Sequence, residues 1–552
     1  MTGFCRKSPL FILVFFIIPI LFLTTGCGEG GGGGGSDDSA KAEEITISGK
    51  ITFDSVPATV SGLDYSSTTK KPVRGVLVEA IKASDSSILD STVTDTQGNY
   101  SLSVPENTEV IIRIKAQMIQ NGSPSWDFRV VDNTNAKALY VMESSVFNSG
   151  TTDISNKNLN ASSGWGGTSY TSARVAAPFA ILDFIYQALQ VILSVDADVN
   201  LPQLLINWSP DNIPSPGIKS SGYIGTTHYS FSEKEIYILG AEDNDTDEYD
   251  GHVIVHEFGH YLVHRLGRTD TLGGQHSLTD RLDARVAFDE GFDNALSAIV
   301  LGNPDYVDTY GIRQSQGLHM DIEDNDFFGT ARGWYSEESI QSIIYDLYDT
   351  SNESGVDGLS LGFAPLYNVV IKDLKTTSSF TTIFSFIDHL KSRYKGQASV
   401  INAINQLLQY EDITDEAADE WDSTERETND GGNPYSLPVY TELNINVPET
   451  ICISDEFGTY NKLLDNKYFY FEIIFTGNYK FDVIPQSVND DPRIRVYLNG
   501  SLIKEINSGA DGEPESVTMH LTPGTYAGVV TDYKIENNMD HHSTHCYDIF
   551  FN

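Results

Sequence analysis

Short runs in which apolar and polar residues alternate fill the first part of the chain. A period of two is typical of strands with one buried face, and turn residues such as Gly98 and Asn99 separate the runs. The clearest runs cover 45–53, 76–81, 100–104 and 110–114. Their dense spacing predicts a small β-sandwich over 45–147, and the Ser-, Asn-, Gly- and Thr-rich residues 148–170 predict a linker.

The pattern changes to a helical period after this linker. Apolar residues recur at spacings of three and four, and two apolar strands, 204–208 and 235–239, lie among the helices. The helical segments are 178–193, 249–266, 285–301, 336–350, 379–394 and 398–409. We therefore expect an α+β domain over 171–437 and, where strands return, a second β-sandwich over 438–552. A multidomain fold of this kind agrees with a length of 552 residues.

The N-terminus has the features of an export signal. Arg6 and Lys7 precede the apolar run 10–23, which is too short for a comfortable membrane span. A Gly-rich stretch follows it. The pattern predicts a signal peptide over 1–27 and a flexible tether over 28–44.

The predicted signal ends in Leu23-Thr24-Thr25-Gly26-Cys27, which resembles the lipobox of bacterial lipoproteins. Thr24 stands where that motif usually has Leu. The resemblance implies that Cys27 is acylated and becomes the mature N-terminus, so that a lipid anchor holds the protein at the bacterial outer membrane or cell surface. A plain secretory signal cut nearby is the alternative. Both interpretations place the protein outside the cytoplasm.

Cysteine usage and charge fit an extracytoplasmic protein. Apart from Cys5 and Cys27 in the signal, only Cys452 and Cys546 occur, and an oxidising compartment favours a disulfide between them. The 77 acidic and 35 basic residues give a net charge of −42. This charge disfavours nucleic acid as a partner, because phosphate binding needs clustered Lys and Arg. The acidic residues either keep the surface soluble or bind Ca²⁺ in acidic loops.

The central motif of the helical region is His-Glu-Phe-Gly-His at 256–260. His256 and His260 lie one above the other on a helix face, so both imidazoles can reach one Zn²⁺. Glu257 lies beside them, where it can deprotonate a water at the ion. His252 and His264 continue the same stripe. Only the inner pair has a Glu directly after its first His, so we interpret the outer two as solvated or supporting residues.

A catalytic zinc site needs a third protein ligand. The metzincin pattern requires Gly and His where this chain has Val263 and Leu266, so that pattern fails. The Phe-Asp-Glu-Gly-Phe segment at 288–292 resembles the Asn-Glu-Gly-Phe-Ala segment of aminopeptidase N-like gluzincins and, more loosely, the matching helix of thermolysin-like enzymes. The resemblance implies that Glu290 is the third ligand and that the metal lies between two lobes of a gluzincin-like domain. The alternative is a Glu stabilised by the dipole at a helix N-terminus.

The same resemblance implies a carboxylate that orients one of the zinc-binding imidazoles. Thermolysin-like enzymes have an Asp four residues after the ligand Glu. Here that position is Asn294, and the Asp lies one residue earlier, at Asp293. We expect Asp293 to take this role, with Asn294 as its substitute.

A Tyr at the start of a later helix stabilises the oxyanion in aminopeptidase N-like enzymes, and Tyr335 is the matching candidate. His276, His319 and Tyr310 are its rivals. Tyr335 could instead serve only as a hydrophobic staple against Ile340.

The flanking β-rich regions carry weaker resemblances. Residues 71–79 and 94–102 resemble the carboxypeptidase regulatory-like domain, which implies a spacer or adhesion unit. The Leu-Thr-Pro-Gly-Thr-Tyr segment at 521–526 looks like part of the pre-peptidase C-terminal β-sandwich of secreted bacterial peptidases.

These features together predict an extracytoplasmic, lipid-anchored zinc metallopeptidase that acts on peptides or proteins. The loop 267–283 makes the interval between His260 and Glu290 longer than in aminopeptidase N-like enzymes, so their specificity is not carried over. One alternative is a surface binding or adhesion protein whose peptidase-like domain is inactive. Another is a zinc hydrolase that acts on a non-peptide bond.

Overall fold

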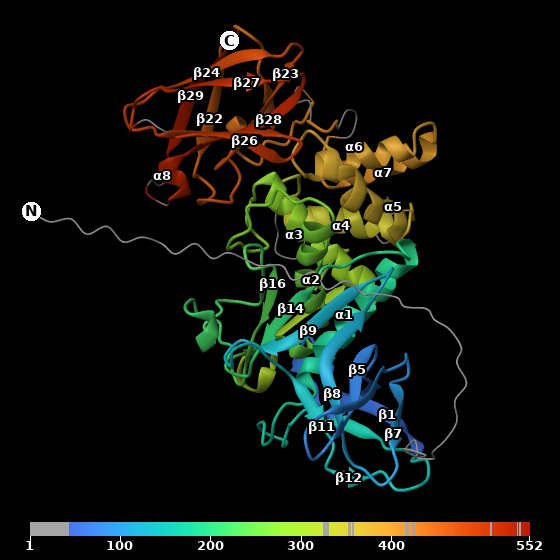
Figure 1. The fold of residues 1–552 in the computed structure, drawn as a ribbon. Helices are drawn as coiled ribbons and strands as arrows, with labels where there is room; N and C mark the ends of the chain where they lie inside the picture. The colour runs from blue at the N-terminus through green and yellow to red at the C-terminus, as the bar shows by residue number, and fades with distance from the viewer. Residues whose placement is uncertain are drawn as a thin grey trace, which may run out of the picture. The chain divides into compact units, whose positions relative to one another are not determined.

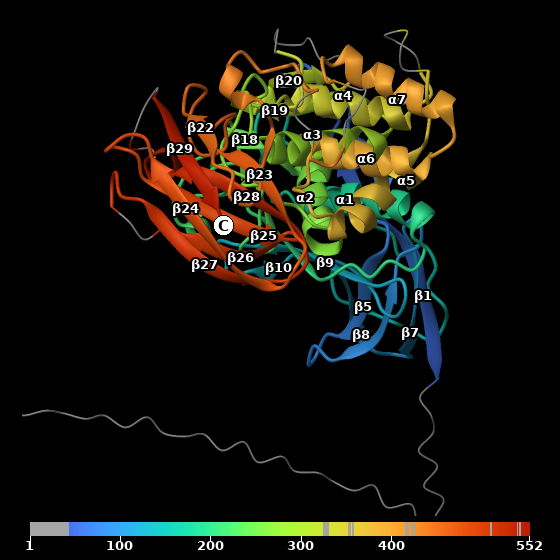
Figure 2. The same cartoon turned by 90° about the horizontal axis from the view of Figure 1, so that it is seen from above.

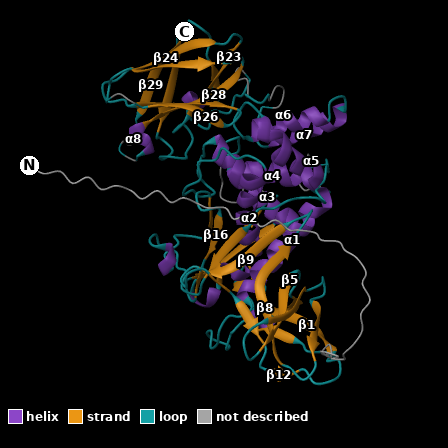
Figure 3. Ribbon diagram, in the orientation of Figure 1, coloured by secondary structure: helices purple, strands orange, loops and turns teal. Residues whose placement is uncertain are grey.

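The computed structural model describes residues 43–323, 331–351, 355, 358–414, 419–421, 426–507, 510–537, 539 and 543–552. Residues 44–552 form one compact unit. The predicted signal peptide, Cys27 and all but the end of the predicted tether lie outside the described residues. The described chain is rich in β-sheet, and its long helices lie in the middle of the sequence (Figures 1 and 3).

The first part of the unit is built from strands, as the alternating pattern predicts. They are β1 (Glu44–Ser55), β2 (Ala58–Thr59), β3 (Gly62–Leu63), β4 (Thr69–Pro72), β5 (Val76–Lys82), β6 (Ile88–Val93), β7 (Asn99–Pro105), β8 (Glu109–Gln120), β9 (Trp126–Asp132), β10 (Ala138–Leu139), β11 (Val141–Glu143), β12 (Phe147–Asn148) and β13 (Leu159–Ala161). The long strand β1 pairs with β7 along its first half and with β4 and β13 along its second half. Alternate residues of β7 are buried, including Tyr100, Leu102 and Val104.

One large sheet runs across the boundary that we predicted near 148–170. Its strand order is β15-β16-β14-β9-β8-β5-β6, where β14 is Leu204–Trp208, β15 is His228–Ser230 and β16 is Glu235–Ile238. Strand β14 pairs in parallel with β9, so that Leu204 lies opposite Phe128. Residues 148–170 are therefore not a linker between two separate sheets. Parallel neighbours need a long crossover connection, and these residues are part of that connection.

Helix α1 (Ala177–Val195) completes the crossover between β9 and β14. By length and composition alone it is apolar enough to cross a membrane. In the structure it contacts β8, β9 and the next helix, and residues such as Ile181 and Ile185 are fully buried. Its apolar character is that of a core helix.

The remaining helices follow in sequence from α1. They are α2 (Gly251–Leu266), α3 (Ala284–Leu301), α4 (Glu337–Tyr348), α5 (Phe363–Asn368), α6 (Ile383–Arg393) and α7 (Ala398–Tyr410). Helix α2 packs between α1 and α3 and also touches β15 and β16 of the large sheet, and α3 packs against α4 (Figure 2). This order places α2 between the sheet and α3.

A small sheet lies next to the N-terminal end of α2. Its strands are β17 (Gly240–Ala241), β18 (Asp245–Thr246), β19 (Asp305–Tyr310) and β20 (Gln316–Asp321), and they pair in that order. The short 3-10 helix η3 (Asp247–Tyr249) leads from β18 directly into α2. Strand β19 contacts both α2 and α3.

The C-terminal part forms two sheets, in agreement with the β-sandwich that we predicted there. One sheet has the order β21-β23-β28-β25-β26 and the other β22-β29-β24-β27. The strands are β21 (Tyr440–Glu442), β22 (Glu449–Ser454), β23 (Lys467–Ile473), β24 (Gly477–Pro485), β25 (Pro492–Leu498), β26 (Ser501–Ile506), β27 (Glu515–Leu521), β28 (Gly524–Asp532) and β29 (Thr544–Phe551), with the short helix α8 (Tyr533–Glu536). Phe471, Phe481 and Phe551 meet in the core of this region.

Cys452 and Cys546 are joined by a disulfide in this sandwich. They lie directly opposite each other on β22 and β29. The bond thus links the first strand of the four-stranded sheet to the last strand of the chain.

Candidate metal centre

Helices α2 and α3 carry the residues of the predicted zinc site, and both helices are almost wholly buried. His256 and His260 are one turn apart on α2. Helix α3 begins at a carboxylate cap, because the Asp283 side chain accepts the N–H of Arg285 at 3.0 Å. Glu290 lies two turns into α3 and is 4% exposed, so its carboxylate faces the interior, where α2 packs.

Three ligand atoms converge between the two helices. Oε2 of Glu290 lies 3.2 Å from Nε2 of His256 and 3.4 Å from Nε2 of His260. Ligand atoms that are each about 2.0–2.1 Å from a tetrahedral zinc ion lie about 3.3 Å from one another. Both separations fit ligands of one zinc ion, and all three atoms lie within 4.8 Å of one another.

The far nitrogen of each imidazole is held by a partner on α3. Nδ1 of His256 lies 2.7 Å from Oδ1 of Asn294, and Nδ1 of His260 lies 2.6 Å from Oδ2 of Asp293. Oδ2 of Asp289 also lies close to Nδ1 of His260, at 2.9 Å. A carbonyl or carboxylate oxygen at Nδ1 accepts the ring proton there, which leaves Nε2 with a lone pair for a metal.

Helix α4 orients Asn294 in turn. The Asn294 side-chain amide donates to Oε1 of Glu337 at 2.7 Å and to Oε1 of Gln341 at 2.9 Å, so its oxygen must point toward His256. The close approach of α4 depends on Gly291. A Cβ there would lie 2.6 Å from Cβ of Ile340, which is too near for both helices to keep their places.

Gly259, between the two histidines, makes room for Asp293. A Cβ at position 259 would lie 2.1 Å from Oδ1 of Asp293. We expect Gly259→Ala to displace this carboxylate from His260 and to weaken zinc binding by about 10–100-fold, as loss of an orienting partner does. Alanine favours a helix over glycine, so a weaker helix would not explain the loss. Competition with a chromophoric chelator measures the affinity.

Gly477→Ala is a matched control for this variant. Its added Cβ would meet Tyr479 at an ordinary 3.4 Å, in a strand of the C-terminal sandwich. We expect this control to bind zinc as the wild type does. Wild-type affinity in Gly259→Ala would contradict the role that we assign to Asp293.

The electrostatics of the site favour a cation. Burial lowers the pKa of His256, but the hydrogen bond to Glu290 and the negative charges of Glu257 and Glu290 together outweigh burial and raise this pKa to about 9. Burial raises the pKa of Asp293 to about 7, against the opposing charge of His260. The carboxylates thus draw protons onto the imidazoles. A divalent cation can take the place of those protons, with their release on binding.

Glu257 is held by the edge of the large sheet. It is 7% exposed, and its Oε2 accepts the backbone N–H of Tyr229, in the edge strand β15, at 2.6 Å. One hydrogen bond fixes this carboxylate beside the ligand pair while its other oxygen remains for a second partner.

The Tyr335 hydroxyl is hydrogen-bonded to groups other than the three ligands. The side chain is 2% exposed within the core, and its hydroxyl donates toward the carbonyl of Arg332 and Oδ1 of Asn429, each at 3.0 Å. A phenol that is buried this deeply needs hydrogen-bond partners, and it finds them in its own turn and in a later loop. The role in catalysis that we expected for Tyr335 does not fit this placement.

His276 is the rival that lies at the site. Its Nε2 is 3.6 Å from Oε2 of Glu290 and 3.4 Å from Oε2 of Glu337. The His276 side chain is 22% exposed, against 7% for that of His260, so it lies on the solvent side of the ligands. By contrast, His319 pairs with Asp305 at 2.9 Å.

The two outer histidines of the α2 stripe have other partners. Nε2 of His252 lies 3.0 Å from the carbonyl of Asn303, and Nδ1 of His264 lies 2.9 Å from the hydroxyl of Tyr229. They hold α2 to neighbouring segments, which agrees with a supporting role.

Sequence reasoning missed two carboxylates of the site. Asp289 is four residues before Asp293 on α3, so a search for i, i+4 carboxylates would have found it. Glu337 is on α4, and nothing in the sequence around it indicated that this helix would pack over Glu290.

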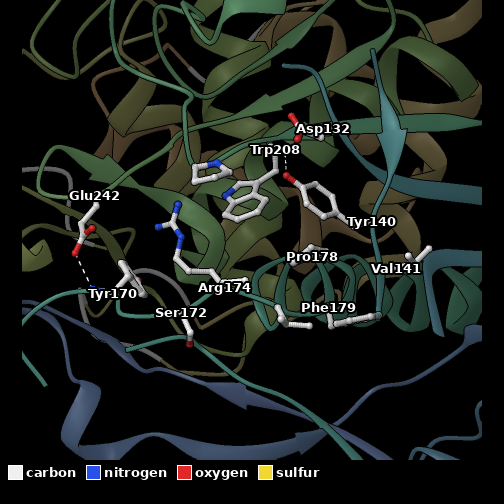
Figure 4. A pocket seen from close by; sticks show the side chains of 13 residues that line it. Asp132, Tyr140, Val141, Tyr170, Ser172, Arg174, Pro178, Phe179, Trp208 and Glu242 are labelled. Atoms are coloured by element: carbon white, nitrogen blue, oxygen red, sulfur yellow. Dashed lines mark hydrogen bonds between the residues drawn. The ribbon is translucent and has the colours of Figure 1, made fainter. Parts of the chain in front are cut away.

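A separate cavity of about 510 Å³ opens beside α1 (Figure 4). Tyr140, Tyr170, Arg174, Trp208 and Glu242 are among its lining residues. The Arg174 guanidinium lies 4.6 Å from the centre of the Tyr170 ring and 5.0 Å from that of Trp208. None of the three converging ligands lines this cavity, so we do not assign the metal chemistry to it.

Residues 195–406 match the sequence model of the Mycolysin C-terminal domain, which relates the chain to metallopeptidases. The matched segment is less than half of the chain and contains α2, α3 and α4, with His256, Glu257, His260 and Glu290. No curated protein has significant sequence similarity to the chain.

Several solved structures share a limited likeness to the chain. The pre-peptidase C-terminal domain of a collagenase from Bacillus anthracis has 13% identity over 20% of this chain and 94% of that domain, with a TM-score of 0.16. PliG of Salmonella Typhimurium, a periplasmic inhibitor of g-type lysozyme, has 11% identity over 20% of this chain and 98% of PliG, with a TM-score of 0.15. CorA of Methylomicrobium album BG8, a surface-associated copper-binding protein, has 11% identity over 20% of this chain and 96% of CorA, with a TM-score of 0.16. Likenesses this weak have no bearing on function.

Proposed function

We propose that the chain is a zinc-dependent metallopeptidase that hydrolyses peptide bonds in peptides or proteins outside the cytoplasm. The observation that carries the proposal is the convergence of Nε2 of His256, Nε2 of His260 and Oε2 of Glu290, with separations of 3.2 and 3.4 Å from the carboxylate oxygen. The partners at both Nδ1 atoms support it, because they leave the Nε2 atoms ready for a metal. The match of this segment to a metallopeptidase-related family agrees.

The residues present have a defined role around such an ion. Zinc bound there would lower the pKa of a bound water toward neutrality and polarise the scissile carbonyl. Glu257, fixed by the N–H of Tyr229, would accept a proton from the attacking water and deliver it to the leaving amine. Asp293 and Asn294 would keep the two imidazoles in place through the cycle.

His276 replaces Tyr335 as our candidate for oxyanion stabilisation. It lies beside Glu290 on the solvent side, in the loop 267–283, where a substrate carbonyl would approach. A ring N–H in that position would donate a hydrogen bond to the carbonyl oxygen as negative charge develops on it.

The cellular location in this proposal rests on the N-terminal sequence. A signal peptide that ends at Cys27 would lead to a lipid anchor, and the Gly-rich tether would hold the catalytic part away from the membrane. The natural substrates would then be extracytoplasmic peptides or proteins.

Metal analysis and a cleavage assay on the purified full chain test the proposal. We expect one zinc ion per chain and cleavage of casein or of a peptide library, both of which are lost on treatment with 1,10-phenanthroline and restored by added zinc. Bound zinc with no cleavage of any peptide would favour an inactive binding protein or a hydrolase for another bond. A chain that binds no zinc would refute the proposal.

A further inference from the structure

A second group of carboxylates lies at the N-terminal end of α2, apart from the zinc ligands. Asp245 is on β18, Asp247 begins η3, and Asp308 is on the neighbouring strand β19. One carboxylate oxygen from each lies within 4.8 Å of the others. Asp245 pairs with Tyr310 across the strands, and Asp308 is two residues before Tyr310, so both acidic side chains share one face of the sheet.

Two of these carboxylates have a buried oxygen with no hydrogen-bond donor. Asp247 is 3% exposed. Its Oδ2 accepts a hydrogen bond from the hydroxyl of Thr227, while its Oδ1 has no partner among the described residues. Oδ1 of Asp245 also lacks a partner there. Buried acceptors without donors are uncommon and unfavourable, so such a group points to a missing ligand.

A fourth carboxylate adds negative charge to the same place. Asp250 is fully buried, and its charge raises the pKa of Asp247. Its own Oδ2 accepts the N–H of Thr309 at 2.9 Å. The described groups that shift the pKa of these aspartates most are other carboxylates and hydrogen-bond donors, and none of them is a cation. Arg174, which precedes α1 in the chain, pairs with Glu248 of η3 at 3.1 Å.

Mutual repulsion and burial make this cluster unfavourable without a positive charge. Burial and the charge of Asp245 raise the pKa of Asp308 to about 7. Burial and the other aspartates raise the pKa of Asp247 well above its ordinary value. Either protons or a metal ion must neutralise part of this charge.

We propose that Asp245, Asp247 and Asp308 bind one structural Ca²⁺ ion. All three ligands are carboxylate oxygens, which suit a hard cation and not zinc. They come from two chain segments, 245–247 and strand β19, and such a set suits the flexible coordination of calcium better than the strict octahedron of magnesium. The assignment is independent of the zinc site, because none of its ligands is shared.

The position of this site gives the ion a structural consequence. Residues 245–250 lead directly into α2, and Asp308 belongs to the strand that contacts both α2 and α3. An ion that links these segments would fix the start of the helix that carries His256 and His260. Removal of calcium should therefore loosen this end of the domain before it affects the C-terminal sandwich.

Calcium titration of the full chain, with zinc kept saturating, tests the site. We expect one Ca²⁺ per chain by equilibrium dialysis, with a Kd in the range of about 10⁻⁵ to 10⁻³ M. We also expect the unfolding temperature to rise by about 2–6 °C at 100 times the Kd. The combined change of Asp247→Asn and Asp308→Asn should weaken calcium binding by about 100-fold or more and leave the zinc content unchanged.

Glu242→Gln is the matched control, since it removes one charge from the same acidic stretch outside the cluster. It should bind calcium as the wild type does. If the double variant fails to fold, Asp308→Asn alone, at a half-buried position, replaces it. The site is refuted if the wild type binds no calcium at 5 mM, or if the aspartate variants bind it as tightly as the wild type. Magnesium binding at least as tight as that of calcium would overturn the choice of ion.

Discussion

We expect Glu257→Gln to lose peptide-bond hydrolysis while it keeps its zinc. Gln is nearly isosteric with Glu, and its side-chain oxygen can still accept the N–H of Tyr229, so the local fold should persist. An amide cannot take a proton from water at neutral pH. The kcat should therefore fall by about 10²–10⁴-fold, the usual contribution of a general base. Steady-state kinetics on a fluorogenic peptide and zinc analysis of the same sample measure both properties.

Glu233→Gln is a suitable control for that experiment. Its carboxylate is 42% exposed and pairs with Lys219 at the surface, so the same chemical change should cost little. Activity of the control should match the wild type. If Glu257→Gln retained more than a tenth of wild-type kcat, another residue would have to act as the base.

We expect His260→Ala to lose both zinc and activity. The change removes one of the three converging ligand atoms, and it leaves Asp289 and Asp293 buried without the imidazole that now lies 2.9 and 2.6 Å from them. Loss of an orienting partner alone costs a zinc site about 10–100-fold in affinity, so loss of a ligand should cost more than about 100-fold. Competition with a chelator of known affinity measures the change.

His264→Ala separates the role of His260 from a general effect of a lost histidine. His264 is one turn further along α2, where its Nδ1 lies 2.9 Å from the hydroxyl of Tyr229, and it is not one of the three converging ligands. This variant should keep its zinc. Equal zinc loss from both variants, or zinc retained in His260→Ala, would show that the ion is not held where we place it.

Much of the local structure follows from sequence patterns. The 3.6-residue period over 249–266 predicts α2 within two residues of its bounds, and alternation over 100–104 predicts the core of β7. The His-Glu-x-x-His spacing placed two imidazoles on one face, and the structure brings both to Glu290. These inferences succeed because they depend on contacts between residues close in sequence.

Other features depend on pairs that are distant in sequence. The pairing of β9 with β14 joins two parts that composition had separated at 148–170, since a Ser- and Gly-rich segment can be either a linker or part of a crossover. Tyr335 lies just before α4, as its sequence context indicates, but tertiary packing brings its hydroxyl to Asn429. Helix α4 brings Glu337 over the site only because Gly291 allows the close approach.

The sequence by itself determined the long helices, the two histidines with their neighbouring Glu257, and the choice of Glu290 through a family resemblance. Tertiary structure alone decided which groups orient those ligands, that His276 and not Tyr335 lies beside them, and that Asp308 joins Asp245 and Asp247 in a second cluster. The physical reason is that periodicity encodes which face of an element is buried, whereas the partner on the other side is set by how whole elements pack.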